Sequence, residues 1–368
     1  AHLGQHTPNI TALANTSSIT TLEPPLPAVT CTVQSSMLTG LPPKEHGVVA
    51  NGWHERETHE THFWRQSNDL VQGEKIWDVL RKEHETCTVA NMFWWFNMYS
   101  NADIAVTPRP IYCANGRKIP DIWTTPQSLR QTLQNKFGQF PLFNFWGPMA
   151  NIKSTQWIVN ATIEVVDTYQ PTLTLVYIPH LDYPMQKFGP DHVCIAQELQ
   201  KVDAEVGRLI NHFQQQDVEV CILSEYGIEE VNDAIAINKV LRSNGWLTVR
   251  QERGREYLDA GASKCFAVTD HQIAHIYVKE KNDIEVIAAL LRGKSGIEFL
   301  YIGDDRGDLA HQRCGDIVVV STSNKWFSHD WWEDSSKAPD YQATVDIHNK
   351  PGYDPRELFF ADGWRGSK

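Results

Sequence analysis

A threonine, Thr30, stands where a short β-branched stretch is expected to pass into a helix. The stretch begins after a proline-bounded turn at Leu26, and Gly40 is expected to end the helix. A hydroxyl at such a junction is well placed for nucleophilic attack, because the first N–H groups of a helix are unpaired and attract an anion. The same position suits an ordinary helix cap, so both interpretations stay open for a lone threonine.

Three short motifs follow Thr30 along the chain. They are Thr39-Gly40-Leu41-Pro42-Pro43, then His46-Gly47, then Asn51. This order resembles the nucleophile region of the nucleotide pyrophosphatase/phosphodiesterase branch of the alkaline phosphatase superfamily. The resemblance implies that Thr30 is the nucleophile and that Asn51 donates to the oxyanion formed when phosphorus is attacked. One local departure is Thr32-Val33, which stands where the family has Pro-Asn.

The same resemblance implies a first zinc ion held by an Asp-x-x-x-His motif after a strand. Asp182 matches the aspartate of this motif, but Gln186 occupies the position of the histidine. The family's further ligand, the histidine of an H-G-Y-D motif, is replaced by Pro351 in Pro351-Gly352-Tyr353-Asp354, with His348 three residues earlier. We therefore expect Asp182 and His348 among the metal ligands, and Gln186 on the substrate side.

A second zinc ion is implied by the family's S-D-H-G motif, where this chain has Ser224-Glu225-Tyr226-Gly227. Glu225 is the expected ligand there, and Tyr226 is expected to contact substrate. The family also takes an aspartate from its first strand, but no aspartate precedes Asp69, so no residue is assigned to that role. Zinc is the expected ion if a metal binds, although the replaced histidines argue against an intact two-zinc site.

Three other histidines are weaker candidates for metal ligands. His180 lies two residues before Asp182, so both side chains point the same way in an extended segment. His271 and His275 would share one face of a helix or of a strand. Buried histidines paired with carboxylates are a competing interpretation, as is a hydrogen-bonded Glu225–Tyr226 corner. Without metals, His180 or Glu225 would serve as the base for Thr30.

Aromatic residues are concentrated between Trp94 and Trp157, a stretch that is also rich in proline and has little periodicity. It follows the end of an expected strand, where open α/β sheets bind ligands, so Trp94 and Trp95 are expected to stack on substrate. The alternative is an insertion that packs on itself.

The composition excludes several classes of protein. A net charge of −12 over 368 residues argues against a nucleic-acid polymer as partner, so we expect a small phosphorylated or aromatic substrate. No apolar run approaches the roughly 20 residues of a membrane span. Seven scattered cysteines without CxxC pairs favour a cytoplasmic location.

Alternating helical and buried-strand patterns predict the fold. Strands are expected over 86–94, 172–178, 218–223, 267–278 and 316–321, and helices over 73–83, 158–169, 195–213 and 283–291. This alternation predicts an α/β, alkaline-phosphatase-like sandwich, with a mainly parallel central sheet, helices on both faces and a smaller added lobe. The expected parts are a core at 1–230 with an insertion at 95–157, a lobe at 231–345 and a return to the core at 346–368.

These observations predict a hydrolase of phosphodiester, pyrophosphate or related bonds, with Thr30, Asn51, Asp182 and Glu225 converging in one pocket. One alternative is a diverged enzyme with one metal or none, acting on an aromatic or apolar substrate by non-hydrolytic chemistry. Another is a binding protein that has lost catalysis.

Overall fold

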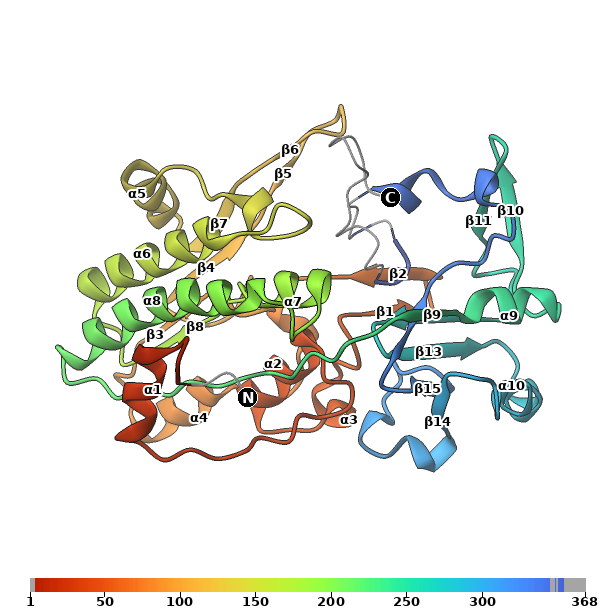
Figure 1. Ribbon diagram of the computed structural model, residues 1–368, viewed down its shortest axis with the longest axis horizontal. Helices are drawn as coiled ribbons and strands as arrows, with labels where there is room; N and C mark the ends of the chain where they lie inside the picture. Colours follow the sequence, from red (N-terminus) through yellow and green to blue (C-terminus); the bar gives the residue numbers. More distant parts are fainter. Residues whose placement is uncertain (1–3, 345–347, 349, 354–368) are drawn as a thin grey trace. The chain divides into compact units, whose positions relative to one another are not determined.

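The computed structural model describes residues 4–344, 348 and 350–353. The chain divides into two compact units, which are described separately (Figure 1). The first comprises residues 1–23, 66–70 and 74–228, and the second comprises residues 24–65, 71–73 and 229–368. The expected core at 1–230, lobe at 231–345 and return to the core at 346–368 stay predictions. Residues 24–65, which include Thr30, group with the later part of the chain instead of with the first 230 residues.

The first unit is built on a four-stranded mixed sheet with the order β7-β4-β3-β8. Strand β3 pairs in parallel with β4 and β8, whereas β7 is antiparallel to β4. The strands expected over 86–94 and 172–178 therefore form, although both are shorter than expected. The four strands are β3 (Val89–Met92), β4 (Ile104–Pro108), β7 (Ile122–Thr125) and β8 (Leu173–Val176).

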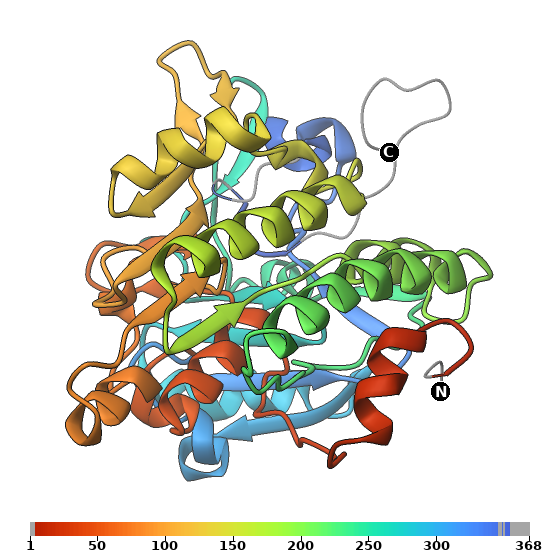
Figure 2. The ribbon, with the colours of Figure 1, turned by 90° about the vertical axis from the view of Figure 1, so that its left-hand side faces the viewer.

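Helices α6 (Ile152–Tyr169) and α8 (Cys194–Gln214) run side by side in this unit, and both were predicted (Figures 1 and 2). Ile158, Ala161 and Val165 of α6 are buried against apolar residues of the sheet. The remaining elements of the unit are α1 (Pro8–Asn15), α4 (Ile76–Glu83), β5 (Ile111–Tyr112), β6 (Lys118–Ile119), α5 (Ser128–Phe137), α7 (Asp182–Phe188) and short 3₁₀ turns at Asn68–Leu70 and Leu142–Asn144.

The aromatic-rich stretch contributes strands β4 and β7 and helix α5 to this unit. Its rings pack on one another, with the Phe93 and Phe140 centroids 5.1 Å apart and Trp95 and Trp146 5.8 Å apart. Trp95 is only 2% exposed, so its ring belongs to the interior. These contacts agree with the interpretation in which the stretch packs on itself, whereas the stacking of Trp94 and Trp95 on a substrate stays a prediction.

Residues 218–223 do not form the strand that we expected. No described strand pairs with them, so β8 is the last strand of the sheet on that side. Val220 packs against α6 and α8, while its neighbours on both sides are exposed. One anchoring side chain holds the segment against the helices without completing a ladder of backbone hydrogen bonds.

The second unit contains an antiparallel sheet with the order β12-β13-β15-β14. The single strand expected over 267–278 is a hairpin, with β12 and β13 joined at His271 and Gln272. Strand β15 and helix α10 occupy the expected positions. The bounds are β12 (Cys265–Asp270), β13 (Ile273–Val278), α10 (Ile284–Leu291), β14 (Ile297–Ile302) and β15 (Ile317–Ser321).

The segment around Thr30 joins this unit through β1, which contacts β12. A separate pair, β9 and β16, is parallel. The other elements are α2 (Thr30–Thr39), α3 (Pro43–His46), β1 (Gly52–Glu55), β2 (Glu60–Phe63), β9 (Asp233–Ala236), α9 (Ile237–Ser243), β10 (Val249–Glu252), β11 (Arg255–Leu258), β16 (Lys325–Ser328) and short 3₁₀ turns at Lys281–Asp283, Gly303–Leu309, Ser335–Lys337 and Asp340–Ala343.

The fold class is therefore α/β, as predicted. No described helix has the length and apolar character needed to cross a membrane.

Candidate functional site

Thr30 is the first residue of helix α2, one position after the extended cap residue Val29. Among the described residues no β-strand precedes it, although the cap residue Val29 has an extended backbone. The side chain is 5% exposed. The next N–H group, that of Cys31, donates to Asn51 Oδ1 at 3.0 Å. Thr30 therefore stands at the positive end of the helix, and Asn51 already holds the first N–H beyond it.

The Thr-Gly-Leu-Pro and His-Gly motifs shape the path from the helix to Asn51. Gly40 ends α2 and Gly47 ends α3, both with left-handed backbones (φ 68° and 76°) that glycine adopts without strain. His46 Nδ1 accepts the N–H of Val48 at 3.1 Å, so its Nε2 donates to Ser36 Oγ at 2.9 Å. Burial lowers the pKa of His46 to about 4. This neutral histidine ties helix α2 to the turn that follows it.

Asn51 is held from two sides. Its backbone N–H donates to Asp270 Oδ2 at 2.8 Å, and its Nδ2 donates to Asp270 Oδ1 at 3.2 Å. Together with the Cys31 contact, these bonds fix the side-chain amide in one orientation. The second hydrogen on Nδ2 remains for another acceptor.

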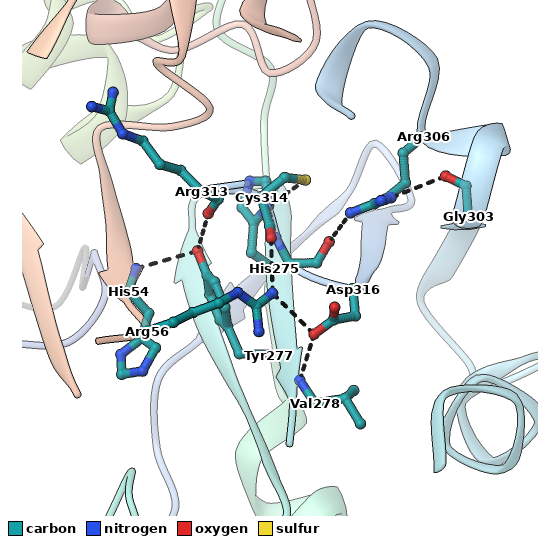
Figure 3. A network of polar contacts seen from close by, with 11 residues as sticks. His54, Arg56, His275, Tyr277, Val278, Gly303, Arg306, Arg313, Cys314 and Asp316 are labelled. Atoms are coloured by element: carbon teal, nitrogen blue, oxygen red, sulfur yellow. Dashed lines mark hydrogen bonds and ion pairs between the residues drawn. The ribbon is translucent and has the colours of Figure 1, made fainter. Parts of the chain in front are cut away.

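Strand β1, which follows Asn51, is fastened by the polar network of Figure 3. The His54 N–H donates to the Tyr277 hydroxyl at 3.2 Å, and that hydroxyl donates to the Arg313 carbonyl at 2.8 Å. The Arg313 guanidinium donates back to the Gly47 carbonyl at 2.8 Å. Burial raises the pKa of Tyr277, so the phenol stays neutral. The loop that carries Arg313 thus holds the chain on both sides of Asn51.

His271 and His275 do not form the pair that we expected. His271 lies in the β12–β13 turn with φ 59°, whereas His275 is a fully buried residue of β13. His275 Nδ1 accepts the Gly315 N–H at 3.2 Å, and burial lowers its pKa to about 4. His275 is therefore a core residue. His271 Nδ1 contacts Asp270 Oδ1 at 2.7 Å. Our sequence analysis missed Asp270, although an Asp-His pair between two apolar β-runs was a signal for it.

The Pro-Gly-Tyr-Asp motif packs against the end of β12. The N–H of Tyr353 donates to the Thr269 carbonyl at 3.0 Å, and the Tyr353 ring stacks on His271 with centroids 3.8 Å apart. A Cβ at Gly352 would lie 2.6 Å from Thr269 Oγ1. Asp354 lies outside the described residues. His348 is exposed, and its role as a metal ligand stays a prediction.

In the first unit, Asp182 is the first residue of α7. Gln186 and Tyr226, which stand where the family motifs have histidine, both contact its carboxylate. Gln186, one turn later, donates from Nε2 to Asp182 Oδ2 at 2.7 Å. Tyr226 donates from its hydroxyl to Asp182 Oδ1 at 3.2 Å. We call Asp182, Gln186 and Tyr226 the Asp182 triad. Glu225 is half-buried beside Tyr226.

His180 is not directed at this triad. Its Nε2 contacts Glu198 at 2.7 Å, and the same carboxylate also accepts from Lys201 at 2.8 Å. Burial is the main cause that lowers the pKa of His180. His180 is thus paired with a carboxylate, as the competing interpretation expects, and its role as a metal ligand stays a prediction.

The residues of the Asp182 triad do not fit the zinc set that the resemblance implies. An amide nitrogen and a phenol hydroxyl donate to the carboxylate, whereas zinc is usually bound by imidazole, thiolate and carboxylate. No three His, Cys, Asp or Glu residues within the described ranges are arranged to hold a metal ion.

The expected site residues belong to different units. Thr30 and Asn51 lie in the second unit, whereas Asp182 and Glu225 lie in the first. Their convergence in one pocket stays a prediction.

Comparison with known proteins identifies the family. The family model for type I phosphodiesterases and nucleotide pyrophosphatases matches residues 1–354. The chain belongs to this family. An uncharacterized pyrophosphatase/phosphodiesterase of Schizosaccharomyces pombe is 23% identical over 237 residues, which are 62% of this chain and 42% of that protein. The chain thus spans less than half the length of this relative.

Two solved structures have a fold similar to that of this chain. Murine ectonucleotide pyrophosphatase/phosphodiesterase 5, an inactive variant in complex with AMP, has a TM-score of 0.58 at 16% identity, covering 89% of this chain and 76% of that one. Phosphonoacetate hydrolase from Sinorhizobium meliloti, in complex with phosphonoformate, has a TM-score of 0.61 at 14% identity, covering 88% and 77%. These similarities confirm the predicted fold class.

The packing of Gly352 gives a first prediction. Gly352→Ala should lower the free energy of unfolding by about 1–3 kcal/mol, because the added methyl group overlaps the Thr269 hydroxyl and the backbone carbonyl 3.0 Å away. Urea denaturation measures the change. Gly227→Ala is the control, since a Cβ there meets nothing within 4 Å. Equal midpoints for the two variants would contradict the packing described here.

The Asp182 triad gives a second prediction. Gln186→His combined with Tyr226→His should bind zinc about tenfold or more tightly than the original chain, because two donors become imidazole ligands. Competition with a chromogenic chelator measures the affinity. Gln131→His, on the exposed face of α5, controls for an added surface imidazole. One zinc per unmodified chain, lost in Asp182→Asn, would show that the triad is a metal site after all.

Proposed function

We propose that the chain hydrolyses phosphodiester or pyrophosphate bonds through a covalent intermediate on Thr30. The observation that carries this proposal is the contact between the Cys31 N–H and Asn51 Oδ1, which fixes an amide beside the start of helix α2. A nucleophile, a helix N-terminus and an oriented amide donor are thereby gathered in one unit of the fold.

The proposed reaction begins when Thr30 Oγ1 forms a bond to phosphorus and the bond from phosphorus to the leaving oxygen breaks. Negative charge develops on the phosphoryl oxygens during this step. The helix N-terminus favours that charge, and the remaining hydrogen on Asn51 Nδ2 is available to an oxygen atom. Water then attacks phosphorus and releases Thr30.

The relatives support this choice of chemistry. The murine protein bears a threonine-to-alanine replacement, is named inactive and holds AMP. The bacterial protein is named a hydrolase of phosphonoacetate and holds a phosphonate. Both ligands are small and carry a phosphoryl or phosphonyl group. A small phosphorylated substrate also agrees with the net charge of −12, which disfavours a long polyanion.

The Asp182 triad favours a second candidate function. A carboxylate that accepts from a glutamine and a tyrosine suits a protein that binds a phosphorylated ligand on the same fold without turning it over. Turnover of any substrate separates the two candidates.

Replacing Thr30 tests the nucleophile. Thr30→Ala should abolish turnover of bis-p-nitrophenyl phosphate while costing about 1 kcal/mol of stability, because only a hydroxyl and a methyl group near a helix start are lost. Thr30→Ser should retain activity, since the hydroxyl survives. Thr32→Val is the matched control on the same helix, because Thr32 is buried and its Oγ1 has no hydrogen-bond partner among the described residues. Full activity in Thr30→Ala would refute the proposal.

Replacing Asn51 tests the oxyanion donor. Asn51→Ala should lower kcat about 100- to 1000-fold, the usual effect of losing one such donor. It should also lower stability by about 1–3 kcal/mol, because the Cys31 N–H and Asp270 lose partners. Asn238→Ala removes another buried amide bound to β12 and is the control, expected to lose stability but not rate. Equal rate losses in both variants would assign Asn51 a purely structural role.

A further inference from the structure

His271 is held in an unusual way at the tip of the β12–β13 hairpin. Its backbone has a φ of 59°, a conformation that non-glycine residues adopt seldom and that often marks a functional position. Its ring stacks on Tyr353 at an interplanar angle of 15°, and its Nδ1 lies 2.7 Å from Asp270 Oδ1. Two independent contacts therefore fix the plane of the imidazole.

Asp270 determines which nitrogen of His271 carries the hydrogen. Its side chain is 1% exposed, and both carboxylate oxygens accept hydrogen bonds from Asn51. Because the carboxylate acts as an acceptor, Nδ1 of His271 is the donor in their contact. In the neutral imidazole, Nε2 is then the unprotonated nitrogen.

Nε2 of His271 is available to a ligand. The side chain is 32% exposed, and this nitrogen makes no hydrogen bond to any residue that the structure describes. A buried carboxylate behind Nδ1 and an accessible Nε2 are the arrangement by which an imidazole is oriented for proton transfer.

Two other histidines of the second unit lack this combination. His46 Nε2 contacts Ser36 Oγ, and His275 is completely buried. His271 is also connected to Thr30, because Asp270 binds Asn51 and Asn51 binds the Cys31 N–H. The proton-transfer group and the nucleophile are thus positioned by one shared pair of residues.

We propose that His271 is the catalytic acid–base residue of the site, oriented by Asp270. This inference rests on the proposed function and deepens it. As the Thr30 Oγ1–phosphorus bond forms, the hydroxyl proton passes to His271 Nε2, and the leaving oxygen departs as an anion from the opposite side of phosphorus. In the second half, water attacks phosphorus from that opposite side and loses a proton to solvent, while the imidazolium returns its proton to Thr30 Oγ1 as the Oγ1–phosphorus bond breaks. The imidazole is neutral before the first half-reaction and after the second.

The test uses the full chain with His271→Gly, because glycine tolerates the positive φ and leaves space for free imidazole between Asp270 and Tyr353. The variant should hydrolyse bis-p-nitrophenyl phosphate about 10²- to 10⁴-fold more slowly, the usual range for one acid–base group. The loss should be of similar size for diphenyl phosphate, because His271 acts on Thr30 Oγ1 and not on the leaving phenol. Added imidazole should restore much of the rate, an effect that a merely structural role would not show.

The matched control is His59→Gly. His59 is another exposed histidine with positive φ (56°), in the turn between β1 and β2, and it should change neither the rate nor the response to imidazole. Full activity in His271→Gly, or a loss that imidazole does not restore, overturns the inference. The inference is also overturned if the His271→Gly variant loses a bound metal ion together with its activity, because His271 would then be a metal ligand.

The two proposals fail in different ways. If Thr30→Ala is inactive while His271→Gly keeps full activity, only the role of His271 is wrong. If the unmodified chain hydrolyses neither diester, the proposed function is refuted and the inference fails with it.

Discussion

The buried contact between Asn51 and Asp270 is the interaction on which the second unit depends. A single side-chain amide accepts from the start of helix α2 and donates to the end of strand β12, while its backbone N–H donates to the same carboxylate. Because an unpaired buried polar group costs free energy, losing one of these three bonds also destabilises the other two. The position of Thr30 relative to the β-sheet follows from that pairing.

Both units contain a carboxylate that accepts hydrogen bonds from several side chains. Asp270 accepts from an asparagine and a histidine, and Asp182 accepts from a glutamine and a tyrosine. Amide and phenol groups satisfy carboxylate lone pairs without the desolvation cost that a second buried charge would add. The same chemistry therefore serves two purposes, since it orients a candidate acid–base histidine in one unit and occupies a family metal-ligand position in the other.

Local patterns in the sequence predicted local structure well. Helix α2, its glycine end and the later helices followed from periodicity and turn residues, which act within a few positions. The partner of Asn51 could not be predicted in this way, because Asp270 lies 219 residues further along the chain. No local rule connects such positions.

Two errors have a related cause. The segment at 218–223 has the composition of a strand, but a strand also needs a neighbour with free backbone groups, and composition does not reveal neighbours. His271 and His275 share a spacing that fits one face of a single element, whereas His271 lies in a turn and His275 in strand β13. In both cases the decisive information was the path of the chain between elements.

The 219-residue separation between Asn51 and Asp270 also has a consequence during synthesis of the chain. The segment around Thr30 leaves the ribosome before the Asp270 carboxylate that fixes it. At about 5–20 residues per second, the delay is roughly 10 to 45 seconds. During that time the strands of the first unit emerge, while helix α2 still lacks the anchor that Asn51 and Asp270 provide. The geometry around Thr30 is therefore complete only after the β12–β13 hairpin has left the ribosome and formed.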